Sequence, residues 1–116
     1  MMVTIFHNPR CTKSRQTLKL LEDRGISPDI VHYLKVPLNE EELKILLGKL
    51  DMSPRDFMRK GEAIYKELGL SDPEKPDSEL IEAMIKHPIL MERPVVIVGE
   101  KAVIGRPPEN VLDLID

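Results

Sequence analysis

The sequence predicts a single α/β domain in which a βαβ unit, a helical block and a ββα unit follow one another. Three observations predict this order: β-branched segments near both ends of the chain, helical spacing of apolar residues through its middle, and turn residues between these segments. The chain has 116 residues and a formal net charge of -3. A chain of this length buries enough surface to fold without a disulfide or a structural metal.

The N-terminal βαβ unit is predicted from residues 2–34. Residues 2–6 are rich in β-branched side chains and form the first strand, which Pro9 and its neighbours interrupt. Residues 12–24 keep helical spacing, and Gly25 is placed to end that helix as a C-terminal cap. Residues 29–34 are then extended, which completes a strand, a helix and a second strand with a right-handed crossover.

The middle of the chain, from about residue 39 to residue 90, is predicted to be helical. Asn39 and Glu42 resemble a capping box at the start of one helix. Apolar side chains follow at helical spacing, namely Leu43, Leu46, Leu47 and Leu50. Ser53 and Pro54 start a further short turn of helix. A later helix starts near Asp77, ends at His87 and Pro88, and buries Ile81, Met84 and Ile85.

The C-terminal ββα unit is predicted from residues 95–115. Residues 95–98 and 102–104 are two apolar strands, and the three residues between them are few enough for an antiparallel hairpin. Apolar residues at Val111, Leu114 and Ile115 then predict a last helix.

Composition and charge exclude several classes of protein. The longest apolar runs are a few residues, whereas a membrane span needs about 20, so we expect no membrane segment. The mildly acidic charge disfavours a general nucleic-acid binder. One cysteine and three scattered histidines cannot build a cysteine-rich zinc site, so we expect no metal, a free thiol and a reducing, cytoplasmic location. With only four aromatic residues, a monomer is expected.

Cys11 is the strongest candidate for chemistry because it lies between the end of a strand and the start of a helix. The helix dipole and the free backbone N–H groups favour a thiolate there. Arg10, Lys13, Arg15 and His7 add positive charge nearby. The thiolate is the nucleophilic form of cysteine, and the same helix end attracts phosphate-like anions. The pattern therefore predicts attack by Cys11 on an oxyanion, or on a disulfide carried by an acidic peptide.

Two familiar cysteine chemistries do not fit this spacing. A tyrosine-phosphatase loop needs an arginine six residues after the cysteine, where this chain has Thr17. A dithiol redox motif needs a second cysteine at the position that Ser14 occupies. An external thiol must therefore resolve any intermediate formed on Cys11.

Three arginines stand beside breaks in regular structure: Arg59, Arg93 and Arg106. Arginine offers a planar fork of donors that matches tetrahedral oxyanions, and it stays charged when partly buried. Each is a candidate anion ligand. His32 and His87 have no comparable setting and are interpreted as structural.

Several segments together resemble the glutaredoxin-coupled arsenate reductases, the ArsC/Spx-like group, and indicate a short chromosomal ArsC-type member. In chain order these are His7-Asn8-Pro9-x-Cys11-x-x-Ser14-Arg15, Leu68-Gly69-Leu70, His87-Pro88-Ile89-Leu90, Arg93-Pro94-Val95-Val96 and Arg106-Pro107. The resemblance runs nearly end to end. It implies one thioredoxin-like domain over residues 1–116, with a mixed sheet and a helical insertion at about 39–90.

The resemblance also implies roles for individual residues and partners. Cys11 would attack arsenate, and the oxyanion would be bound by Arg59, Arg93 and Arg106. The family positions that keep the thiolate available correspond here to His7, Ser14 and Arg15. Pro94 matches a cis proline of these folds. Glutathione would be the co-substrate, glutaredoxin would remove it as a mixed disulfide, and no bound cofactor is implied.

Two other functions remain open from the sequence. The first is a glutathione-dependent monothiol oxidoreductase, in which Cys11 to Ser14 would act on glutathionylated substrates. The second is a regulator like the Spx-type proteins, which bind RNA polymerase through this fold. The second is disfavoured because those regulators commonly carry a Cys-x-x-Cys switch and depart from the Gly-Arg-Pro at residues 105–107.

Overall fold

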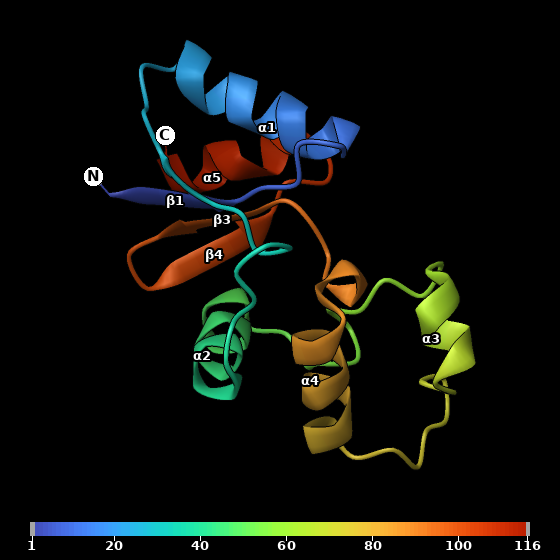
Figure 1. The fold of residues 1–116 in the computed structure, drawn as a ribbon. Helices are drawn as coiled ribbons and strands as arrows, with labels where there is room; N and C mark the ends of the chain where they lie inside the picture. The colour runs from blue at the N-terminus through green and yellow to red at the C-terminus, as the bar shows by residue number, and fades with distance from the viewer. Residues whose placement is uncertain (1, 116) are drawn as a thin grey trace. The chain divides into compact units, whose positions relative to one another are not determined.

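The computed structural model describes residues 2–115, and its strands form one sheet (Figure 1). The strands are β1 (Val3–Phe6), β2 (Asp29–Val31), β3 (Val95–Val98) and β4 (Lys101–Ile104). Their order in the sheet is β2-β1-β3-β4. β1 is parallel to β2 and antiparallel to β3, which is in turn antiparallel to β4. The predicted mixed sheet and C-terminal hairpin are confirmed.

The strands and helices follow one another along the chain as a βαβ unit, a helical block and a ββα unit, as predicted. They are α1 (Thr12–Asp23), α2 (Glu40–Leu50), α3 (Ala63–Glu67), α4 (Asp77–Lys86) and α5 (Leu112–Ile115), with 3-10 helices η1 (Pro88–Leu90) and η2 (Pro108–Val111). α3 was not predicted, because five residues are too few to show an apolar stripe. No helix within residues 2–115 combines the length and the apolar composition that a membrane crossing requires.

Two local predictions are wrong, and a third is confirmed. The extended segment expected over residues 29–34 ends at Val31, because the N–H groups of Lys35 and Val36 donate to the His32 carbonyl and close a turn. Residues 54–57 form the predicted short turn, in which the Phe57 N–H donates to the Ser53 carbonyl and the Ser53 hydroxyl accepts from the Asp56 N–H. Ile85 is only half-buried, whereas Leu80 and Ala83 are buried in α4.

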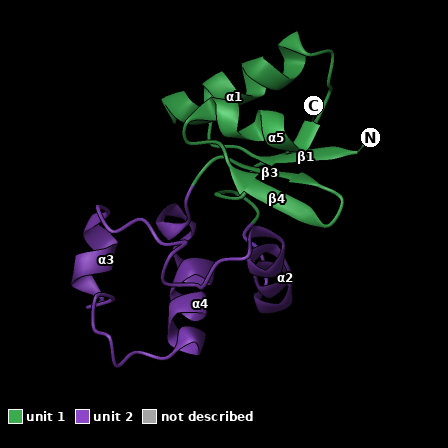
Figure 2. Cartoon of the chain, turned by 180° about the vertical axis from the view of Figure 1, so that it is seen from behind, with its two compact units in different colours: residues 1–36, 93–116 green, residues 37–92 purple. Residues whose placement is uncertain are grey.

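The chain divides into two compact units (Figure 2). Unit 1 comprises residues 1–36 and 93–116 and contains the whole sheet, α1 and α5. Unit 2 comprises residues 37–92 and contains α2, α3 and α4. The helical block expected at about 39–90 lies within unit 2.

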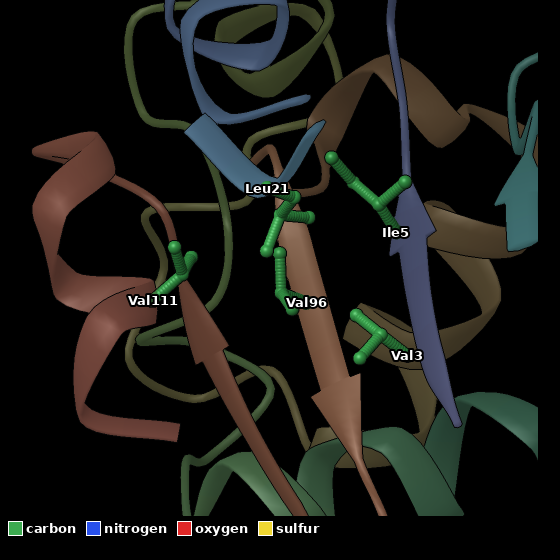
Figure 3. Packing of buried hydrophobic residues seen from close by; sticks show 5 residues of the cluster. All are labelled: Val3, Ile5, Leu21, Val96 and Val111. Carbon is green, nitrogen blue, oxygen red and sulfur yellow. The ribbon is translucent and has the colours of Figure 1, made fainter. Parts of the chain in front are cut away.

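The core of unit 1 lies on one face of the sheet. Ile5 pairs with Val96 in the β1–β3 register, so the two side chains share a face. Val3, two residues before Ile5, lies on the same face. Leu21 of α1 and Val111 of η2 complete a cluster of buried side chains (Figure 3). α1 and the C-terminal helical segment therefore cover this face, and this packing fixes the N-terminus of α1 against the sheet.

Unit 2 starts with the predicted capping box. The Asn39 side chain accepts from the Glu42 N–H at 2.8 Å, and the Glu42 carboxylate accepts from the Asn39 N–H at 3.0 Å. Along α2 the leucines at helical spacing include the buried Leu43, Leu46 and Leu47. The sequence thus determined both the start and the buried side of this helix.

Candidate functional site

Cys11 is the N-cap residue of α1 and is held there by a tight turn. Its N–H donates to the Asn8 carbonyl at 2.9 Å, and its carbonyl accepts from the Arg15 N–H at 3.0 Å. A second hydrogen bond holds the same turn, because the Asn8 side chain accepts from the Arg10 N–H at 3.0 Å. The sulfur makes no capping hydrogen bond to the helix, so it remains available for chemistry at the positive end of α1.

The surroundings of Cys11 favour its thiolate. Burial raises the pKa of the Cys11 thiol, but this effect is outweighed by the Ser14 and Lys13 N–H groups and by the Arg93 guanidinium. The net result is a pKa below the ordinary value of 9.0. Cys11 therefore meets the first requirement for a nucleophile.

Arg106 brings a second cation to the sulfur. Its Nη1 lies 3.7 Å from Cys11 Sγ and donates to the Arg93 carbonyl at 3.2 Å. Arg93 itself is buried, although it carries a charge. Arg106 thus contacts the sulfur, while Arg93 is among the groups that lower the pKa of the Cys11 thiol, through a side-chain hydrogen bond and through its charge. The structure brings these two predicted arginines together around the predicted nucleophile.

The peptide bonds that follow both arginines are cis. Pro94, the expected cis proline, has a cis bond to Arg93, and Pro107 has one to Arg106. Pro94 accepts a hydrogen bond from the Gly105 N–H at 2.9 Å, so the two Arg-Pro segments are joined by their backbones.

Thr17 and Gly105 form a contact that sequence reasoning missed. A Cβ added to Gly105 would lie 2.6 Å from Thr17 Oγ1 and 3.0 Å from Pro94 Cγ, closer than atoms can approach without displacement. Thr17 is fully buried, and its hydroxyl donates to the Lys13 carbonyl at 2.8 Å. The glycine lets the segment before Arg106 pack directly on α1. The only sequence signal was a glycine that immediately precedes a candidate arginine.

His7 and Ser14 form a buried pair behind the cysteine loop. His7 Nδ1 lies 2.6 Å from Ser14 Oγ, which also accepts from the Asn8 N–H at 3.0 Å. Burial first, and then the charges of His32 and Arg15, lower the pKa of His7 below 6.5, so its ring is neutral near pH 7. A neutral imidazole carries a single N–H, so the tautomer decides whether Nδ1 accepts from the Ser14 hydroxyl or donates to it. The pair fixes the first turn of α1, whose N–H groups face the sulfur.

Arg15 and Arg59 occupy different settings from the two arginines at the sulfur. The exposed Arg15 guanidinium donates to the Pro9 carbonyl at 2.8 Å and to Thr12 at 3.3 Å, so it braces the turn before Cys11. Arg59 belongs to unit 2, where its Nε lies 3.6 Å from a Glu62 carboxylate oxygen. Its role as an anion ligand stays a prediction.

The constellation in unit 1 suits attack on an anion. A stabilised thiolate and two guanidinium groups lie at one helix start, where backbone N–H groups also point outward. Cations of this kind can hold an oxyanion and neutralise the repulsion between it and the thiolate. Within residues 2–115, no group of three acidic, histidine or cysteine side chains is arranged to hold a metal ion.

Comparisons with known proteins agree with this geometry. Residues 6–114 match the model of the ArsC family. The uncharacterised protein YfgD of Escherichia coli is 50% identical over 97% of this chain and 96% of its own length. An arsenate reductase of Neisseria meningitidis serogroup B is 48% identical over 94% of each chain. The solved structure of an arsenate reductase from Vibrio cholerae is 48% identical, with a TM-score of 0.95 over 97% of both chains. The thioredoxin-like fold that the sequence predicted is therefore confirmed.

Proposed function

The chain belongs to the ArsC family, and we propose that it is an oxidoreductase that reduces arsenate to arsenite through an adduct on Cys11. One observation carries the proposal most directly: the Cys11 sulfur, whose pKa is lowered, lies 3.7 Å from a guanidinium nitrogen of Arg106. This places a nucleophile beside a donor that is matched to an oxyanion.

The first step joins arsenate to Cys11. The Cys11 thiolate attacks arsenic, an S–As bond forms, and an arsenate oxygen leaves as water after taking up protons. Arg93 and Arg106 hold the remaining oxygens, and their charges offset the repulsion between the thiolate and the incoming anion. Arg59 is proposed as a third ligand of the oxyanion, from unit 2. During this step, the first turn of α1 is kept in place by His7, Ser14 and Arg15.

The second step reduces arsenic with an external thiol. A glutathione thiolate displaces a second arsenic-bound oxygen, which leaves as water, and forms a second S–As bond. An S–S bond then forms between glutathione and Cys11 as both S–As bonds break, and a water molecule returns the lost oxygen to arsenic. The two sulfurs together lose two electrons, and arsenic keeps that pair and leaves as arsenite. Glutaredoxin then removes glutathione from Cys11 by thiol–disulfide exchange. An external thiol is needed because Cys11 is the only cysteine of the chain.

Several features of the working protein belong to the same proposal. It acts as a monomer in the cytoplasm, where glutathione keeps thiols reduced, and it needs no bound cofactor or metal. It does not require nucleic acid or a membrane.

The test is arsenate-dependent oxidation of NADPH by the purified protein with glutathione, glutaredoxin and glutathione reductase. The wild-type protein should oxidise NADPH in proportion to added arsenate, and Cys11→Ser should reduce the rate to that without enzyme. Chemical denaturation of Cys11→Ser provides the control for folding. Turnover that persists in Cys11→Ser would overturn the proposal.

A second candidate function uses the same Cys11 thiol, which has a lowered pKa and no second cysteine beside it in the motif. If the wild-type protein shows no arsenate turnover but its thiol alkylates rapidly at neutral pH, Cys11 acts on glutathionylated substrates instead. Exchange with a glutathionylated peptide, unaffected by replacement of Arg106, would identify that function.

A further inference from the structure

A cavity of about 240 Å³ lies in unit 1 against the turn that precedes Cys11. Its walls come from the turn itself and from the segment after β2, and they include His7, Pro9, Arg10, His32, Leu34 and Lys35. The two segments meet because the His7 N–H donates to the Val31 carbonyl at 2.9 Å and continues the parallel pairing of β1 with β2.

The residues that line the cavity include both cationic and apolar groups. Arg10 and Lys35 supply two full positive charges, and among the described residues none that lines the cavity is acidic. Pro9, Leu34 and the imidazole rings supply apolar surface. The rings of His7 and His32 meet edge to face, with centroids 6.3 Å apart. Such a lining suits a ligand that carries a carboxylate on an aliphatic stem.

The cavity is connected to the nucleophile through short contacts. Arg10 immediately precedes Cys11, and the Asn8 carbonyl accepts from the Cys11 N–H at 2.9 Å. His7, which lines the cavity, is bonded to Ser14 at 2.6 Å, and the Ser14 N–H stabilises the thiolate. One extended residue spans at most about 3.6 Å. Since Arg10 of the cavity wall is the residue next to Cys11, a tripeptide anchored in the cavity is long enough for its thiol to approach the sulfur.

We propose that this cavity binds a carboxylate-bearing end of the small peptide thiol that resolves the Cys11 adduct. This inference rests on the proposed function, because that function calls for such a thiol. A carboxylate of the peptide pairs with Arg10 and Lys35, and its aliphatic carbons lie against Leu34 and Pro9. The cavity is thus separate from the oxyanion site formed by Arg93 and Arg106.

The size of the cavity favours a peptide fragment over a tetrahedral ion. Its volume corresponds to roughly eight water molecules, which is more than one tetrahedral oxyanion fills. It lies just below the range of about 300–1,000 Å³ that drug-sized ligands occupy. One or two residues of a peptide therefore fit it, while the cysteine of that peptide extends toward the sulfur.

A binding experiment tests the cavity without any arsenate chemistry. The Cys11→Ser protein is titrated with S-methylglutathione, which has no free thiol, and backbone amide shifts are followed by NMR at low salt. We expect shifts at His32 and Leu34, and binding weakened about tenfold by Arg10→Ala with Lys35→Ala. Lys101→Ala is the matched control, because Lys101 is an exposed lysine on β4, at the opposite edge of the sheet from β2.

Two outcomes of this titration would overturn the inference. The first is binding that Lys101→Ala weakens as much as Arg10→Ala with Lys35→Ala does. The second is a cavity that responds to inorganic phosphate but not to S-methylglutathione, which would make it an ion site instead.

Kinetics separate the failure of this inference from the failure of the proposed function. In the arsenate assay, Lys35→Ala should raise the KM for glutathione about threefold and leave the KM for arsenate unchanged. An unchanged KM for glutathione in an active enzyme would overturn the cavity assignment alone. Absence of arsenate turnover, with charge-dependent binding of S-methylglutathione retained, would overturn the proposed function alone.

Discussion

The guanidinium of Arg106 lies 3.7 Å from the sulfur of Cys11, although 95 residues separate the two in the sequence. Arg106 reaches this position because Gly105, immediately before it, packs on Thr17 and donates to the Pro94 carbonyl. The anion site therefore depends on backbone packing as much as on charge, and the two contributions can be tested separately.

Replacing Arg106 by lysine should lower kcat/KM for arsenate about tenfold. An ammonium keeps the charge but cannot offer two parallel donors to an oxyanion. Steady-state arsenate reduction gives the ratio, with Arg24→Lys, an exposed arginine at the end of α1, as the control. Equal values of kcat/KM for Arg106→Lys and the control would show that Arg106 does not hold the substrate.

Replacing Arg93 by methionine should raise the pKa of the Cys11 thiol. Burial of the sulfur raises this pKa, and the Arg93 charge is among the groups that reverse the effect. Without that charge, less thiolate is present at neutral pH and alkylation by iodoacetamide becomes slower. The midpoint of the alkylation rate against pH measures the shift. The control variant Arg24→Met should leave this midpoint unchanged. An unchanged midpoint in Arg93→Met would contradict the assignment of Arg93 as a group that lowers the pKa of the Cys11 thiol.

Gly105→Ala should destabilise the protein by about 1 to 3 kcal/mol. The added methyl group would lie 2.6 Å from Thr17 Oγ1, so the segment before Arg106 must shift. Urea denaturation measures the loss in free energy of unfolding. Adding Thr17→Ala removes the two Thr17 atoms that crowd the new methyl group, so the double variant should lose less than the sum of the two single changes.

Gly48→Ala is the matched control for Gly105. Gly48 lies inside α2, and no atom lies within 4 Å of the position of its added Cβ. Alanine there should stabilise the protein by about 1 kcal/mol, because glycine is unfavourable in a helix interior. If both alanine variants were equally destabilised, close approach at Gly105 would not be the cause.

His7 should make the folded protein less stable in mild acid. Burial first, then His32 and Arg15, hold the pKa of His7 below 6.5, so the unfolded chain binds this proton more tightly than the folded one. The free energy of unfolding therefore falls as the pH drops below about 6.5, until the folded-state pKa is passed. Urea denaturation measures the free energy of unfolding at pH 7.5 and at pH 5.0. The decrease between these two values should be larger for the wild type than for His7→Gln.

An NMR titration of the His7 ring gives a direct control for that prediction. Its midpoint should lie below 6.5 in the folded protein and return to about 6.5 in concentrated urea. A folded-state midpoint at or above 6.5 would contradict the stated cause.

Local patterns predicted much of the fold. The capping box at Asn39 and the leucine spacing after it determined α2, and the short apolar strands on either side of Gly99 determined the β3–β4 hairpin. The early end of β2 was missed because it depends on bonds to the His32 carbonyl, which no local pattern encodes.

The candidate site was only partly predictable. Cys11 could be recognised from its place at a helix start, whereas the roles of Arg93 and Arg106 came from a family resemblance. The contact of Thr17 with Gly105 and the meeting of His7 with His32 both depend on the register between segments far apart in the chain. Spacing within one segment contains no information about such a register.

Unit 1 is assembled from both ends of the chain, and this has a consequence during synthesis. A ribosome completes Cys11 and α1 long before it reaches Arg93 and Arg106, because all of unit 2 is made in between. Until β3 pairs with β1, the growing chain therefore carries a cysteine without its two cationic neighbours. The part of the thiol's acidity that Arg93 supplies is therefore acquired late, so the single cysteine of the unfinished chain lacks one of the groups that lower its pKa.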